Sequence, residues 1–152
     1  MAKRHRVLVS DKISQRALET LQKSNIDFDY KPDCGTRNSL KEVIEPYSGL
    51  IIRSASKVSR DVIDRGKNLQ VIGRAGIGVD NIDLKAASSK GIVVMNTPHG
   101  NAITTAEHTL AMIFASSRQI PAADRSTQQG KWEKSKFMGQ ELTGKILGLI
   151  GV

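Results

Sequence analysis

The sequence has almost no cysteine and no long hydrophobic run. Cys34 is the only cysteine among 152 residues, so no disulfide can form within the chain, and a reducing compartment is expected. After the basic first residues only positions 7–9 are continuously apolar, which is too short for the apolar region of a signal peptide. No stretch approaches the length of a membrane span. These absences predict a cytoplasmic protein without a membrane segment.

Aromatic residues and metal-ligand clusters are also scarce. The chain has one Trp, two Tyr and three Phe, while 23 Lys and Arg against 15 Asp and Glu give a formal net charge of +8. Such a balance favours anionic partners: phosphorylated metabolites, nucleotides or nucleic acid. The basic residues are scattered and form no stripe with stacking aromatics, so no nucleic-acid partner is expected. The three histidines belong to no His or Cys cluster, so no metal site is expected either.

Short apolar runs rich in β-branched residues recur at a steady spacing of 21 or 22 residues. They begin at Val7, Phe28, Leu50, Val71 and Ile92. Each interval between them carries a short helical pattern, and the runs are continuously apolar rather than alternating. This organisation predicts an α/β fold with a parallel sheet that helices cover on both faces.

The rhythm changes after Pro98. Residues 102–130 carry a helical pattern, and Pro121 is expected to kink it or to divide it into two helices. Residues 145–152 predict an apolar strand that ends at a glycine, and such a strand needs partners that the rest of the chain does not supply. A strand followed by glycine is also how a dinucleotide-binding fingerprint begins. We therefore expect a compact α/β unit over residues 1–100 and the truncated start of a nucleotide-binding domain over residues 101–152.

Ligands of open α/β sheets bind beyond the carboxyl ends of the strands. Asp11 follows the first expected strand, Arg53 and Ser54 the third, and Arg74 the fourth, where it opens a glycine-rich stretch at 73–78. Guanidinium groups bind carboxylate or phosphate in a bidentate manner. For Arg53 alone, extension of the side chain into solvent or pairing with a helix carboxylate is an equally good interpretation, but a second arginine at an equivalent position favours an anion site. The glycine-rich stretch does not match the dinucleotide fingerprint, so it is a weak candidate for a phosphate loop and is more typical of a tight turn before a helix capped by Asp83.

Three functions fit these features. The first is an enzyme fragment that holds the substrate half of a cleft. The second is a non-catalytic anion-binding or regulatory module, which the same two arginines would serve. The third is a phospho-acceptor receiver domain, which would require an acidic cluster at the strand ends, where only Asp11 is found.

Residues 71–83 resemble the corresponding stretch of the D-isomer-specific 2-hydroxyacid dehydrogenases. Residues 49–58, 94–98, 130–133, 136–139 and 141–145 narrow the resemblance to the members that act on 3-phosphoglycerate. The likeness runs from about Val7 to Val152. It implies NAD-dependent oxidation of 3-phosphoglycerate, a small phosphorylated 2-hydroxy acid, to 3-phosphohydroxypyruvate, the first step of serine synthesis. It also implies a flavodoxin-like substrate domain in the first hundred residues, followed by the first helix and first strand of a Rossmann domain, and a homo-oligomer when the protein is full length.

The resemblance also implies roles for individual residues. Substrate-binding positions correspond to Arg53, Ser54, Arg74, Gly76 and Asn101. Cofactor-binding positions correspond to Ile77, where some relatives carry threonine, and to Gly151, the first glycine of the fingerprint. The family's catalytic arginine, glutamate and histidine come from later positions, so no catalytic residue is expected in this chain.

Overall fold

The computed structural model describes residues 5–36 and 39–150. The chain divides into two compact units, Met1–Asn101 and Ala102–Val152, and each is described here by itself.

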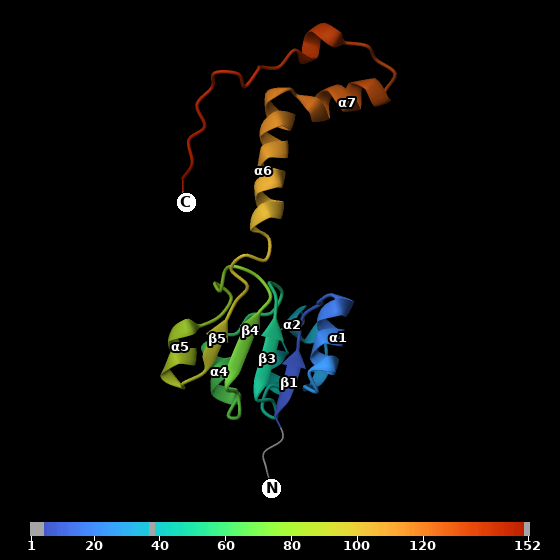
Figure 1. Ribbon diagram of the computed structural model, residues 1–152. Coiled ribbons are helices and arrows are strands. Elements are labelled where there is room, and N and C mark those ends of the chain that lie inside the picture. The colour runs from blue at the N-terminus through green and yellow to red at the C-terminus, as the bar shows by residue number, and fades with distance from the viewer. Residues whose placement is uncertain (1–4, 37–38, 151–152) are drawn as a thin grey trace. The chain divides into compact units, whose positions relative to one another are not determined.

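The first unit is built on a five-stranded, all-parallel sheet (Figure 1). Its strands are β1 (Arg6–Val9), β2 (Asp27–Tyr30), β3 (Gly49–Ile52), β4 (Val71–Arg74) and β5 (Val93–Met95). They lie in the order β2-β1-β3-β4-β5, which is the flavodoxin-like order. All five strands that the apolar spacing predicts are present, and the expected α/β fold with a parallel sheet is confirmed.

One face of this sheet forms the core. The strand register aligns Leu8 with Leu50, Leu50 with Ile72 and Ile72 with Val94, so these side chains form one row across four strands. The first three are at most 1% exposed. The row packs with residues of α3 (Leu40–Val43), α4 (Arg60–Arg65) and α5 (Leu84–Ser89). Burial of this row therefore fixes both the register and the positions of the strand ends.

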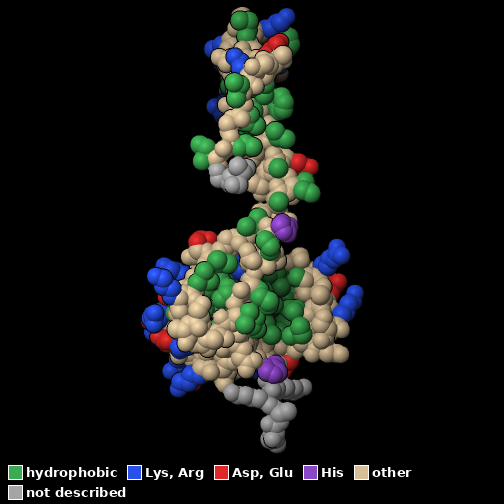
Figure 2. All heavy atoms as spheres, turned by 60° about the vertical axis from the view of Figure 1, so that its left-hand side comes forward, with side chains coloured by type: hydrophobic (Ala, Val, Ile, Leu, Met, Phe, Trp, Pro, Cys, Tyr) green, Lys and Arg blue, Asp and Glu red, His purple; other side chains and the backbone are tan. Residues whose placement is uncertain are grey.

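The opposite face is only partly covered, so the expectation of two covered faces is wrong for the described residues. Among the described helices, only α1 (Gln15–Lys23) lies against this face, beside Ile51 of β3. Val93 and Met95 of β5, which lie in the outer rows of the same face, are 57% and 54% exposed. Right-handed crossovers explain this, because only the step from β1 to β2 runs in the direction that places a helix here. Hydrophobic side chains gather in an open area of the first unit (Figure 2).

Local capping signals place two of the helices. The Ser14 side chain accepts a hydrogen bond from Ala17 N before α1, and Asp83 Oδ1 accepts one from Ala86 N, 2.9 Å away, at the start of α5. The short α2 (Asp33–Thr36) follows β2 directly. Because Asp83 caps α5, the glycine-rich stretch before this helix is a turn that leads into it.

The second unit contains α6 (Ala102–Ser117), α7 (Ile120–Gln128) and a 3₁₀ turn at Lys134–Phe137. The predicted division near Pro121 is confirmed: the helix breaks at Gln119, whose φ is +54°, and Pro121 lies in the first turn of α7. None of the described helices is long and apolar enough to cross a membrane.

The expected terminal strand is not formed. Residues 145–150 have no regular secondary structure, and Ile146 and Ile150 are fully exposed. A strand exists only through pairing, and no strand of the described residues pairs with this segment. Gly151, the predicted first glycine of the fingerprint, lies outside the described residues.

Candidate functional site

A polar cleft of about 410 Å³ opens at the carboxyl ends of the strands in the first unit. Its lining comes from the segments after β1, β2 and β3. The lining residues are Asp11, Lys12, Pro32, Asp33, Arg53, Ser54 and Ala55. The cleft therefore brings together Arg53 and Ser54, two of the predicted substrate-binding residues, with the Asp11 that the strand ends indicate.

Arg53 holds its guanidinium at the cleft through a single backbone contact. Its Nη1 donates to the carbonyl oxygen of Lys12 at 3.2 Å. The side chain takes part in none of the ion pairs found among the described residues. The alternative interpretation, in which a helix carboxylate neutralises Arg53, is thus not what the described structure shows. No other partner of this guanidinium is found in the described part of the chain, so its remaining N–H groups are available to an anion.

The loop that carries Arg53 rests on a buried carboxylate. Asp11 is 2% exposed, and its Oδ2 accepts hydrogen bonds from the backbone N–H groups of Arg53 (2.5 Å) and Ser56 (3.1 Å). Its Oδ1 accepts from the Ser56 hydroxyl at 2.6 Å. A carboxylate so fully occupied and so buried is a poor phosphate acceptor, which argues against the receiver-domain interpretation.

Asn81 holds the same loop from the other side. Its Nδ2 donates to the carbonyl oxygens of both Arg53 and Ser56, each at 2.7 Å. Sequence reasoning missed Asn81, because this side chain contacts a loop 25 to 28 positions earlier in the chain. The only signal was its place next to Asp80 in the segment that matches the family.

Arg74 and Gly76 form a second, local arrangement next to the cleft. Ile52 pairs with Arg74 in the register, so Arg53 and Arg74 leave neighbouring strand ends. A Cβ atom at Gly76 would lie 2.5 Å from Arg74 Nη1, so the absence of a side chain there makes room for the guanidinium. Arg74 Nε is buried without a hydrogen-bond partner among the described residues. The two residues lie together, but neither is among the residues that line the polar cleft holding Arg53, so their predicted roles stay predictions.

Ile77 and Asn101 lie outside the cleft. The Ile77 side chain is 43% exposed, and its carbonyl oxygen accepts a hydrogen bond from Asn96 Nδ2 at 2.7 Å. This contact, together with the bond from Thr97 N to Gly76 O at 3.0 Å, ties the glycine-rich turn to the end of β5. Asn101 is exposed and directly precedes α6. The predicted roles of both residues stay predictions.

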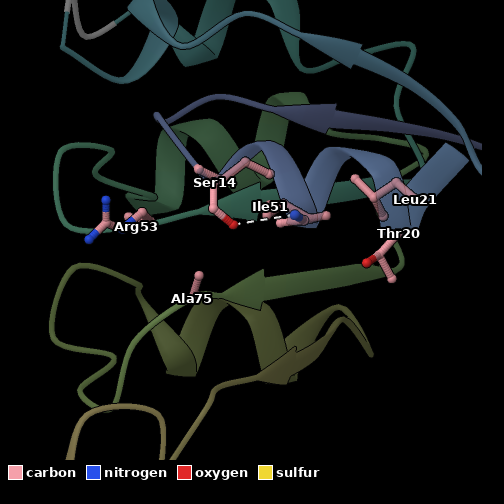
Figure 3. Close-up of a pocket in the computed structure, with 8 residues that line it drawn as sticks. Ser14, Thr20, Leu21, Ile51, Arg53 and Ala75 are labelled. Carbon is pink, nitrogen blue, oxygen red and sulfur yellow. Dashed lines mark hydrogen bonds between the residues drawn. The ribbon is translucent and has the colours of Figure 1, made fainter. Parts of the chain in front are cut away.

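An apolar groove of about 560 Å³ adjoins the cleft on the open face of the sheet. Ser14, Thr20 and Leu21 line it from the α1 segment, and Ile51 and Ala75 line it from the sheet (Figure 3). The Arg53 guanidinium points away from this groove, beyond the end of β3 (Figure 3). Arg53 thus stands at the rim between an apolar groove and a polar cleft.

The described residues contain no group of three or more His, Cys, Asp or Glu side chains that could hold a metal ion. A separate polar cluster lies around Tyr47, where the hydroxyl donates to Asp29 Oδ2 and accepts from Lys31 Nζ at 3.2 Å. The Tyr47 hydroxyl, assisted by Arg6, lowers the pKa of the Asp29 carboxyl. Burial, reinforced by the bond to Asp29, raises the pKa of Tyr47. This cluster ties β2 to the segment before β3 and belongs to the framework.

Strand order and cleft position define a flavodoxin-like α/β domain with a cleft at its strand ends. Residues 7–145 match the family model described as "D-isomer specific 2-hydroxyacid dehydrogenase, catalytic domain". The chain belongs to this family.

Relatives and solved structures agree with this assignment. Over 147 residues the chain is 48% identical to D-3-phosphoglycerate dehydrogenase of Archaeoglobus fulgidus and 49% identical to that of Sus scrofa. Each alignment covers 97% of this chain, but only 28% and 27% of the two relatives, so the chain spans about a quarter of their length. The NAD⁺-bound 3-phosphoglycerate dehydrogenase of Entamoeba histolytica superposes with a TM-score of 0.69 at 28% identity, covering 91% of this chain and 43% of that one.

Proposed function

We propose that this chain supplies the substrate-binding part of an NAD-dependent D-2-hydroxyacid dehydrogenase that oxidises 3-phosphoglycerate to 3-phosphohydroxypyruvate in serine biosynthesis. The observation that carries the proposal is the cleft at the strand ends, which Arg53 and Ser54 line and where Arg53 forms no ion pair with any residue that the structure describes. The curated relatives named above supply the substrate by analogy. A regulatory anion-binding module would use the same cleft, but the family match over residues 7–145 favours the dehydrogenase.

In this proposal the chain binds and orients the acid, and it does no proton transfer of its own. The Arg53 guanidinium binds one anionic group of the substrate through two parallel N–H donors. Ser54 offers its hydroxyl and its backbone N–H beside it. The backbone N–H groups of Ser54 and Ala55 have no acceptor among the described residues, so they too can donate to an anion.

Arg74 and Asn101 are proposed to contact the substrate from the side of the glycine-rich turn, where Gly76 keeps the space for the Arg74 side chain open. The exposed Ile77 presents an apolar surface on the same turn, which fits the edge of a nicotinamide ring. NAD supplies the hydride acceptor when bound. Gly151 is proposed as the first glycine of its pyrophosphate loop. The general base and the catalytic arginine are expected outside these 152 residues.

Three further features belong to the proposal. We expect a homo-oligomer, which the exposed apolar side chains of Ile103, Leu110 and Met112 on α6 support. We expect a cytoplasmic protein, which the single cysteine supports. The partner is a small phosphorylated acid rather than nucleic acid.

The test joins residues 1–152 to the remaining part of the Archaeoglobus fulgidus relative, which gives a hybrid subunit. This subunit is expected to form NADH with 3-phosphoglycerate, and the 152-residue chain by itself is expected to form none. Turnover by the 152-residue chain would contradict the division of roles. A hybrid that prefers D-lactate over 3-phosphoglycerate would contradict the phosphorylated substrate.

A further inference from the structure

The loop at residues 53–56 has an uneven pattern of backbone hydrogen bonds. Its outer peptide groups are held on both sides, because Arg53 and Ser56 donate through N–H and accept through C=O. Its inner residues, Ser54 and Ala55, have N–H groups with no acceptor among the described residues, and both residues line the polar cleft. The loop is therefore fixed at its ends and leaves its middle donors available.

Asp11 binds the N–H side of the loop and has little capacity left for anything else. Its carboxylate accepts two backbone N–H groups and the Ser56 hydroxyl. Since the Ser56 proton points to Asp11, Ser10 must be the donor in the 2.8 Å contact between the two hydroxyls. Helix α2 closes the network, because a Cβ atom at Gly35 would lie 2.1 Å from Asp11 Oδ1 and 2.3 Å from Ser56 Oγ.

Asn81 binds the C=O side and is itself anchored. The backbone carbonyl oxygen of Asn81 accepts a hydrogen bond from Val58 N at 2.8 Å, and Asp83 N donates to the backbone carbonyl oxygen of Val58 at 2.9 Å. These bonds pair the segment after the loop with the segment that carries Asn81. A single amide group with two donors thus spans the loop from Arg53 to Ser56.

We propose that Asp11 and Asn81 are positioning residues that clamp the loop at 53–56, so that its free N–H groups and the Arg53 guanidinium stay ordered for an anionic substrate. The proposal rests on the proposed function for the identity of that substrate. It assigns neither residue to substrate contact. The competing account treats Asp11 as a negative neighbour of the cleft, which would repel the anion.

Asp11→Asn separates the two accounts by the sign of its effect. It removes a negative charge from the cleft, so simple repulsion predicts a lower KM for 3-phosphoglycerate in the hybrid subunit. The clamp predicts a KM raised by about tenfold, since the amide cannot accept all three donors, with the KM for NAD changed less than about twofold. Asp27→Asn removes one exposed negative charge at the start of β2 and is expected to leave both KM values unchanged. A lower KM in Asp11→Asn would overturn the clamp.

Asn81→Ala provides a second variant that keeps Asp11 intact. Asn68→Ala is its matched control, because Asn68 Nδ2 also donates to a backbone carbonyl, that of Glu45, at 2.9 Å. In the 152-residue chain, amide hydrogen exchange at Arg53 and Ser56, whose N–H groups donate to Asp11, is expected to be about tenfold faster in Asn81→Ala and Asp11→Asn than in the control. Exchange in β3 and β4 is expected to stay unchanged. Equal exchange at Arg53 and Ser56 in all three variants would overturn the clamp.

The KM of Arg53→Ala tests the proposed function separately from the clamp. If Arg53→Ala leaves the KM for 3-phosphoglycerate unchanged, the cleft does not bind that substrate, whereas the exchange measurement still decides whether Asp11 and Asn81 hold the loop. If Arg53→Ala raises that KM while Asp11→Asn and Asn81→Ala do not, the proposed function stands and the clamp is wrong.

Discussion

The two units of this chain make opposite use of their apolar residues. In the first unit, Leu50 and Ile72 are at most 1% exposed and pack beneath helices, whereas in the second unit Leu110 and Phe114 are more than half exposed. Both pairs stand in strongly apolar segments of regular secondary structure. Apolar periodicity therefore specifies a helix or strand, but that helix or strand becomes part of a core only where another one packs against it. The first unit has the partners needed to position a site.

The largest difference between the two units is expected when one apolar side chain is truncated in each. Leu50→Ala or Ile72→Ala is expected to lower the free energy of unfolding by about 2–5 kcal/mol, because each leaves a cavity in a close-packed core. Leu110→Ala is expected to change it by less than about 0.5 kcal/mol. Urea denaturation followed by circular dichroism measures both. Equal losses in the two units would show that α6 is buried in solution.

A smaller loss of stability is expected from a substitution in α2, at the point where this helix lies against Asp11 and Ser56. Gly35→Ala places a methyl group against the Asp11 carboxylate and the Ser56 hydroxyl, and it is expected to cost about 1–3 kcal/mol of stability. Gly148→Ala is the matched control in the second unit, since nothing lies within 4 Å of the added Cβ atom there. Thermal unfolding compares the two variants. A harmless Gly35→Ala would mean that α2 does not close over the network.

Part of the pH dependence of stability should come from Asp29 in the first unit. The Tyr47 hydroxyl, with Arg6, holds the pKa of Asp29 below its ordinary value in the folded state. This carboxylate therefore contributes stability above the ordinary Asp range and loses it as the pH falls through the lowered pKa. Between pH 6 and pH 3, Asp29→Asn is expected to lose a few degrees less in Tm than the parent chain does. Asp27→Asn, on the same strand but exposed, should behave like the parent chain.

The smallest change in stability is expected when the whole second unit is removed. Residues 1–101 contain every buried hydrophobic side chain of the described residues. Removal of residues 102–152 is therefore expected to shift the Tm of the first unit by less than about 3 °C. Differential scanning calorimetry of the two chains tests this. Loss of a cooperative transition in the shorter chain would show that the second unit stabilises the sheet.

The same contrast explains which features the sequence could predict. The five strands could be placed because continuous apolar runs between helical segments leave few other arrangements, and the two helices of the second unit because Pro121 interrupts the pattern. The terminal strand could not, because a strand depends on pairing that its own residues do not encode. Arg53 and Ser54 could be predicted as candidate site residues because they follow the end of a strand and because their segment resembles the family. The contacts of Asn81 were not, because a side-chain bond to a distant loop leaves no local signal.

The central claim is that the cleft at the strand ends binds the anionic substrate through Arg53. The most direct measurement is the pair of KM values of the hybrid subunit that carries Arg53→Ala, with Arg60→Ala, an exposed arginine on α4, as the control. Arg53→Ala should raise the KM for 3-phosphoglycerate by about tenfold or more and leave the KM for NAD within about twofold, whereas Arg60→Ala should change neither. An unchanged KM for 3-phosphoglycerate in Arg53→Ala would contradict the account.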